Sequence, residues 1–283
     1  MDRAIRVSTI DVRSKLAAIL SRNEPLDLVE ASLLVAAEEY PRLEIQTEVR
    51  RLRALGDEAA RRVAAHTNPF ARIDALRAYL FEELSFRGNG EQYDDPRNSF
   101  LNEVLARRLG IPITLSIVYM EVARMAGIDA QGVGLPGHFV VRLHEQGRSL
   151  LIDPYHGGHI ITEEDCRDLV VRTTGRASLF RRDILEGTSA RTMLIRLLLN
   201  LKRIYLARED YPRALSVVER ILIACPDDPK EIRDRGFLLA HLGRTRAAVA
   251  DLEAYLALEP RAADAESVKG RLAWLVRRMS ETH

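Results

Sequence analysis

The chain has 283 residues, of which 47% are hydrophobic, and its 42 basic residues are nearly balanced by 41 acidic ones. This length suggests about two domains, and no apolar run approaches the ~18 residues of a membrane span. The arginines lie among acidic residues, and no basic segment is interleaved with aromatic residues, so neither a nucleic acid nor a membrane is an expected partner. The two cysteines lack disulfide or metal spacing and no apolar export segment opens the chain, which favours the cytoplasm.

The first region, residues 1–85, is predicted to be helical. Apolar residues recur at helical spacing in segments 28–40, 44–66 and 71–84. The turn-rich stretch FRGNGEQYDDPRN, residues 86–98, then breaks this pattern with two glycines and a proline.

The second region, residues 86–187, mixes helices with strands. Asn98 could cap one helix, and Pro112 suits the first turn of the next. After Gly127 the apolar period changes from 3.6 towards 2, and AQGVGL, HFVVRL and SLLIDP are predicted to be three short strands. The region is therefore expected to hold a small antiparallel sheet within an α+β fold.

The third region, residues 190–283, contains an internal repeat. Ala214 and Ala248 are 34 residues apart, and so are Pro226 and Pro260. This pattern resembles the tetratricopeptide repeat, in which each unit is a helix pair with a small residue at the close approach. The resemblance implies an all-α array whose usual use is to bind a protein or peptide partner.

The central region carries a candidate pair of chemical groups. His138 begins one predicted strand, and Asp153 lies fifteen residues on, at the end of the next. Antiparallel pairing of the two strands could bring the side chains together, with the aspartate fixing the histidine tautomer and leaving the other ring nitrogen as a base. A histidine satisfied by the backbone, with Asp153 simply opening a turn, is the alternative.

These motifs resemble the transglutaminase-like cysteine proteins, which use a Cys–His–Asp triad in that chain order; His138 and Asp153 match its last two members. The segments NSFLNEVLARRLGIPITLSIVYMEVAR, GLPGHFVVR and LIDPYHGG are more closely similar to the bacterial SirB-type family. That family fuses a transglutaminase-like domain to tetratricopeptide repeats. The resemblance implies a helical N-terminal region, a core with a small antiparallel sheet and C-terminal repeats.

The nucleophile of that family is missing here. Counting back from Arg124 and Gly127, which match the end of the cysteine-bearing helix, Pro112 falls on the cysteine position. Cys166 and Cys225 both follow Asp153 in the chain, so neither has the family's order. The resemblance therefore implies a catalytically degenerate core within a cytoplasmic protein-interaction or regulatory protein.

A hydroxyl group could replace the missing thiol. Thr114 and Ser116 lie within about one helical turn of Pro112. Either residue, activated by His138 and Asp153, would give an amide or peptide hydrolase or an acyltransferase. Ser116, however, matches a small core position in the family, which favours packing over catalysis.

No cofactor and no metal ion are expected. His156 and His159 follow Asp153 and could join His138, but the spacing is not diagnostic of a metal site, and a polar loop is favoured. The resemblance places four further residues near the same cleft: Asn98, Glu103, Tyr119 and Glu121. Helix capping and hydrogen bonds between helices would also account for them.

Overall fold

The computed structural model describes residues 9–22 and 25–281, and its architecture is the predicted α+β class. The chain divides into two compact units, of which the first ends at Leu197 and the second begins at Leu198. Among the described residues, no helix is long and apolar enough to cross a membrane. The sequence predicted boundaries between regions at residues 85 and 187. Both positions lie within the first unit, so these boundaries stay predictions.

Helices make up the N-terminal part of the first unit, as predicted. They are α1 Thr9–Leu20, α2 Leu28–Glu39, α3 Ile45–Ala64 and α4 Pro69–Arg77, followed by the π-helical turn η1, Ala78–Glu83. Asp27 caps α2 by accepting a hydrogen bond from the Glu30 N–H, and Asn68 caps α4, which starts with Pro69. Both starts use side-chain oxygens to satisfy N–H groups that have no helical partner.

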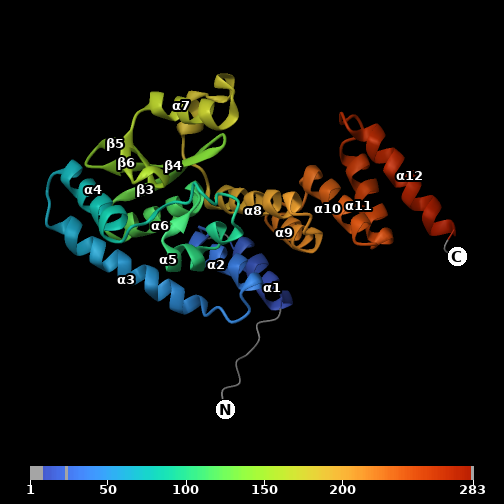
Figure 1. Ribbon diagram of the computed structural model, residues 1–283, viewed down its shortest axis with the longest axis horizontal. Helices are drawn as coiled ribbons and strands as arrows, with labels where there is room; N and C mark the ends of the chain where they lie inside the picture. The colour runs from blue at the N-terminus through green and yellow to red at the C-terminus, as the bar shows by residue number, and fades with distance from the viewer. Residues whose placement is uncertain (1–8, 23–24, 282–283) are drawn as a thin grey trace, which may run out of the picture. The chain divides into compact units, whose positions relative to one another are not determined.

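A four-stranded antiparallel sheet forms the centre of the first unit, in the order β3-β4-β5-β6 (Figure 1). Its strands are β3 Asp129–Leu135, β4 His138–Glu145, β5 Arg148–Asp153 and β6 His159–Ile161. The first three strands were predicted from the change of period, whereas three residues are too few for β6 to show a period. A separate parallel pair joins β1, Arg87–Gly88, to β2, Leu109–Gly110.

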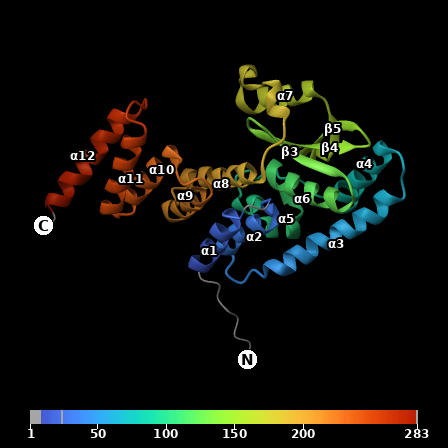
Figure 2. The same cartoon turned by 180° about the vertical axis from the view of Figure 1, so that it is seen from behind.

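Helices cover this sheet. The helices and 3-10 turns of this part are η2 Pro96–Ser99, α5 Leu101–Arg107, α6 Pro112–Met125, η3 Pro154–His156, α7 Glu163–Thr174, η4 Ala177–Leu179 and η5 Arg182–Leu185. Helix α6 packs on β3 and β4, and α3 runs alongside α6 (Figure 2). The apolar stripe of α3 is buried as its helical spacing predicts: Leu52, Leu55, Ala59 and Val63.

Helix α7 and the sheet enclose an apolar cluster. The members of this cluster are Val133, Leu135, Val140, Leu151, Cys166, Leu169, Val170 and Leu185. Cys166 is thus a packed core residue, although it lies in the first turn of α7.

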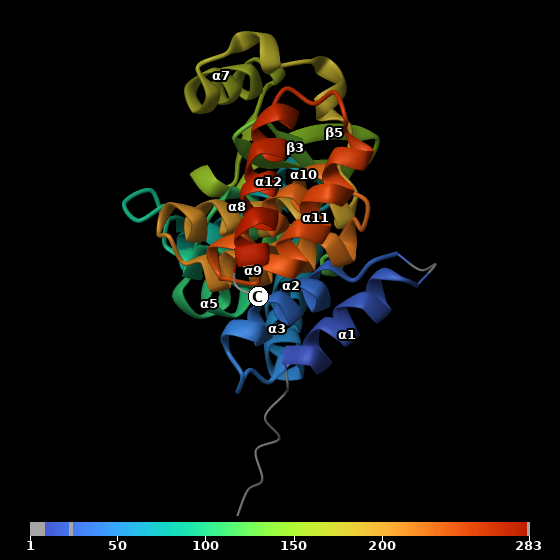
Figure 3. The same cartoon turned by 90° about the vertical axis from the view of Figure 1, so that its right-hand side faces the viewer.

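The C-terminal helices are α8 Ala190–Ala207, α9 Tyr211–Ala224, α10 Pro229–His241, α11 Thr245–Leu258 and α12 Ala265–Glu281. From α9 onwards each helix packs against the next (Figure 3). Ala214 and Ala248, the small residues of the predicted 34-residue repeat, are both fully buried. The arrangement confirms the predicted helical array.

Lys202 and Gly236 are also 34 residues apart, and the structure shows how the array tolerates both. A side chain at Gly236 would bring its Cβ within 2.8 Å of Leu252, so glycine permits the close approach of α10 and α11. Lys202 is buried instead, and its Nζ lies 2.7 Å from Glu231 and 2.6 Å from Asp234 on α10. Two carboxylates therefore neutralise the buried ammonium group.

Candidate functional site

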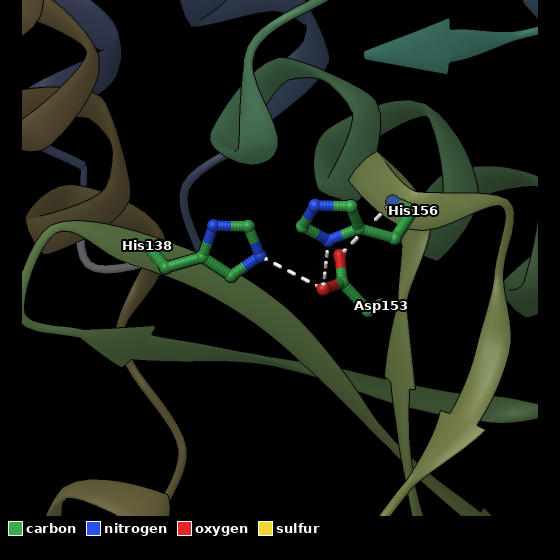
Figure 4. A group of neighbouring side chains, drawn as sticks. All are labelled: His138, Asp153 and His156. Carbon is green, nitrogen blue, oxygen red and sulfur yellow. Dashed lines mark hydrogen bonds and ion pairs between the residues drawn. The ribbon is translucent and has the colours of Figure 1, made fainter. Parts of the chain in front are cut away.

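The β4–β5 hairpin brings His138 and Asp153 together, as the sequence suggested. The two strands pair antiparallel, so the start of β4 lies beside the end of β5. The Nε2 atom of His138 lies 3.0 Å from Oδ2 of Asp153 (Figure 4). His138 is 5% exposed and Asp153 is 2% exposed, so this hydrogen bond is shielded from water.

His156 joins the same carboxylate. Its Nδ1 lies 2.7 Å from Oδ2 of Asp153, and its backbone N–H donates to Oδ1 at 3.3 Å. The Tyr155 N–H donates to Oδ1 at 3.0 Å, so Asp153 also caps η3. The result is a histidine–aspartate cluster, defined as His138, Asp153 and His156, in which the aspartate is central.

The environment keeps this aspartate ionised. Burial raises the pKa of Asp153, but the hydrogen bonds from His138 and then His156 outweigh burial and leave the pKa far below its usual range. Because an ionised carboxylate can only accept hydrogen bonds, Nε2 of His138 must carry the proton. In the neutral ring, Nδ1 is then the acceptor and the only basic nitrogen.

An aromatic frame surrounds the cluster. The Tyr155 ring stands edge-on to His138, with centroids 5.8 Å apart, and Tyr93 contacts Tyr155 at 6.3 Å. The His138 and His156 rings are stacked, with centroids 5.5 Å apart. Gly88 makes room for this frame, because a Cβ there would lie only 2.5 Å from the Tyr155 ring.

Arg196 of α8 fixes the backbone that presents His138. Its Nη2 donates to the carbonyl oxygens of Leu135 at 2.6 Å and His138 at 2.9 Å, across the turn that precedes β4. The guanidinium lies 5.2 Å from the Phe139 ring centroid, and burial lowers the pKa of Arg196. No motif pointed to Arg196 or Tyr93, whereas Tyr155 lies within the LIDPYHGG segment but was assigned no role there.

The start of α6 approaches the same neighbourhood. Gly110 of β2 pairs with Gly88, on which the Tyr155 ring packs, and α6 begins two residues later with Pro112. Helix α6 also contacts η3, which carries Tyr155 and His156. Pro112 therefore opens a helix that contacts the turn carrying His156, and it offers neither a nucleophile nor an N–H group.

Neither Thr114 nor Ser116 of α6 offers its hydroxyl group to His138. Oγ1 of Thr114 accepts from the Ile111 N–H at 3.1 Å and lies 2.8 Å from the Asn98 carbonyl oxygen, to which it can donate. Ser116 is fully buried, and its Oγ has no hydrogen-bond partner in the described part of the chain. The structure therefore brings neither hydroxyl into a hydrogen bond with His138.

The four further residues predicted near the cleft have structural contacts, and Glu121 forms an ion pair with Arg124 at 2.6 Å. Asn98 is buried, accepts from Asn89 at 3.1 Å and donates to the Gln92 carbonyl oxygen at 2.7 Å. Tyr119 stacks on Phe81 with centroids 6.0 Å apart, and burial raises its pKa. Glu103 is half-buried in the first turn of α5, where the helix dipole favours an acidic group.

Cys166 is not available as a substitute nucleophile. It is fully buried, and burial raises the pKa of its thiol to about 12. A thiol in that state remains protonated at physiological pH, whereas the thiolate is the nucleophilic form.

Three metal-ligand atoms meet in the histidine–aspartate cluster. The ring nitrogens of His138 and His156 and a carboxylate oxygen of Asp153 all lie within 4.8 Å of one another. No metal site was expected from the sequence, because the loop between Asp153 and β6 shows no diagnostic spacing. A cavity of about 530 Å³ lies elsewhere in this unit, lined by residues such as Val49, Ile117 and Met193, and of the residues predicted near the site only Glu121 lines it.

Comparison with known proteins agrees with this architecture. A family model described as the transglutaminase-like superfamily matches residues 46–199, and a tetratricopeptide-repeat model matches residues 201–273. A UPF0162 protein of Xylella fastidiosa is 36% identical, and the alignment covers 92% of this chain and 94% of that protein.

Two further relatives show how far the similarity extends. A UPF0162 protein of Vibrio cholerae is 29% identical over 87% of this chain and 91% of its own length. F-box only protein 21 of Mus musculus is 34% identical over 35% of this chain, but over only 17% of its own length. A transglutaminase-like core followed by tetratricopeptide repeats is thus confirmed.

Proposed function

Since the chain belongs to the family of UPF0162 proteins, we propose that it is a cytoplasmic protein-interaction or regulatory protein built on a catalytically degenerate transglutaminase-like core. The C-terminal tetratricopeptide repeats would bind the protein or peptide partner. As part of the same proposal, we infer that the chain is related to the SirB-type family, which its sequence motifs resemble.

The observation that carries the proposal is Pro112 at the first position of α6. Acyl transfer by this fold needs a nucleophile at that helix start, where free N–H groups and the helix dipole favour a thiolate. Proline supplies neither the thiol nor the N–H. The residues that hold the site, His138 and Asp153, remain in place.

A hydrolase or acyltransferase that uses Ser116 or Thr114 is the second candidate. The hydrogen-bonded His138–Asp153 pair favours it, because the pair could still deliver a base. Catalysis would require a serine or threonine oxygen within about 3 Å of the base. The burial of Ser116 and the hydrogen bonds of Thr114 weigh against this candidate.

The last two helices supply a surface suited to a partner. Leu258 of α11 and Trp274 and Val276 of α12 are exposed apolar side chains. The guanidinium of Arg271 lies 4.5 Å from the Trp274 ring centroid, so a positive charge stands over this exposed aromatic ring. Exposed aromatic and arginine residues are frequent in binding hot spots. Apart from this surface, the inference that the repeats bind a partner rests on analogy with other proteins of the same repeat fold.

Cross-linking capture from native cytoplasm with the full-length chain tests the proposal. We expect Trp274→Ala to lose the proteins captured by the wild type. Phe70→Ala is the matched control, because Phe70 is an aromatic residue with 43% exposure against 39% for Trp274, and Arg148 lies over its ring. Loss of the same proteins in both variants, or in neither, would count against the α12 surface. An amidase activity abolished by His138→Ala would favour the second candidate.

A further inference from the structure

The histidine–aspartate cluster brings three potential metal-ligand atoms together, and a catalytically degenerate core gives this arrangement no role. We propose that His138, Asp153 and His156 bind one divalent transition-metal ion of the zinc class, through Nε2, Oδ2 and Nδ1 respectively.

The geometry is close to that of a bound ion. Ligand atoms around a tetrahedral zinc ion, with bonds of about 2.0–2.1 Å, lie about 3.3 Å apart. The distances from Oδ2 of Asp153 to the two ring nitrogens are 3.0 and 2.7 Å, and all three atoms lie within 4.8 Å of one another. Small side-chain adjustments would make room for an ion between them, and each neutral ring would move its proton through solvent to its other nitrogen, Nδ1 in His138 and Nε2 in His156.

The surrounding contacts orient the ligands. Oδ1 of Asp153 accepts from the N–H groups of Tyr155 and His156, which leaves Oδ2 directed at the two imidazoles. Arg196 holds the His138 backbone through two carbonyl oxygens, and the Tyr155 ring packs against the His138 ring. Metal ligands in proteins are typically fixed by such outer contacts.

The charge at the site also favours a cation. The Asp153 carboxyl group is 2% exposed, yet in the described part of the chain no arginine or lysine forms an ion pair with it. Buried charges in proteins are normally paired or coordinate metals. Among the described residues, the imidazoles of His138 and His156 are the only side chains that form hydrogen bonds with this carboxyl group.

The ligand set selects the class of ion and leaves room for a further ligand. Two nitrogen atoms and one oxygen suit zinc and the neighbouring transition metals, whereas magnesium and calcium prefer oxygen ligands throughout. The side chain of His156 is 54% exposed, so an ion there would be open to solvent on one side. Three protein ligands with an open position distinguish a reactive site from a closed structural one.

The experiment is a titration of untagged, EDTA-treated full-length protein with Zn²⁺ by isothermal calorimetry, with Mg²⁺ and Ca²⁺ as comparison ions. We expect saturable binding of one Zn²⁺ per chain and no binding of the other two ions. His156→Ala removes an exposed ligand without disturbing the core, and it should weaken the affinity by at least about tenfold. Co²⁺ should give visible absorption bands that disappear in the same variant.

His144→Ala is the control. His144 is exposed on β4, six residues from His138, which is about 20 Å along a strand. Its removal should leave the affinity for Zn²⁺ unchanged. Absence of saturable Zn²⁺ binding in the wild type, or equal affinities in His156→Ala and His144→Ala, would overturn the proposal.

Discussion

The hydrogen bond between His138 and Asp153 should stabilise the first unit, and His138→Ala measures this contribution. The substitution removes a buried donor to an ionised acceptor at 3.0 Å. A hydrogen bond to a charged group contributes about 1.5–3 kcal/mol, and loss of the buried ring adds a packing cost.

Asp153 would not be left without partners. It keeps the His156 imidazole at 2.7 Å and two backbone N–H groups on Oδ1. These contacts place the cost of the lost bond at the lower end of its range. The expected total is about 2–3 kcal/mol in the free energy of unfolding, which corresponds to about 4–12 °C in Tm for a unit of this size.

The assay is urea unfolding and thermal melting in the presence of EDTA, so that no bound ion contributes. His156→Ala is the matched comparison, since it removes a bond to the same oxygen from a half-exposed ring and should cost less than about 1 kcal/mol. If His138→Ala cost no more than His156→Ala, the argument that the buried pair is a structural contact would be refuted.

Three further predictions concern the rest of the chain. Burial raises the pKa of the Cys166 thiol to about 12, so a thiol reagent at pH 8 should modify Cys225 in the native protein and leave Cys166 unmodified until it unfolds, as mass spectrometry would show. Gly236→Ala should destabilise the second unit by about 1–3 kcal/mol in urea unfolding, because the added methyl group would overlap Leu252. The depressed pKa of Asp153 contributes stability that is present above about pH 4 and is lost as the pH falls towards the folded-state pKa. Stability measured from pH 6 to pH 3 should therefore fall more steeply in the wild type than in Asp153→Asn.

Local patterns were sufficient for most of the fold. Helical spacing located α3, the change of period located β3 to β5, and the 34-residue spacing of Ala214 and Ala248 located the repeats. These signals are local, and the structure keeps them because each apolar face finds a partner to pack against. β6 and the pair β1–β2 were missed, since strands of two or three residues carry no period.

The site was only partly visible in the sequence. His138 and Asp153 could be paired because a hairpin of known register brings the ends of neighbouring strands together. The role of His156 depends on the 3-10 turn that Asp153 caps, and that of Arg196 on a contact 58 residues away along the chain. Neither contact follows from spacing, since each is set by tertiary packing.

An amide-hydrolysis assay on the wild type, Ser116→Ala and His138→Ala, with unfolding stability measured on the same samples, tests the degenerate core most directly. Ser116→Ala is a clean variant, because it removes a buried hydroxyl without a hydrogen-bond partner in the described residues and should be neutral or slightly stabilising. We predict no hydrolysis that depends on either residue, and a loss of stability in His138→Ala alone. Hydrolysis by the wild type that disappears in both variants while their stability remains intact would contradict the account.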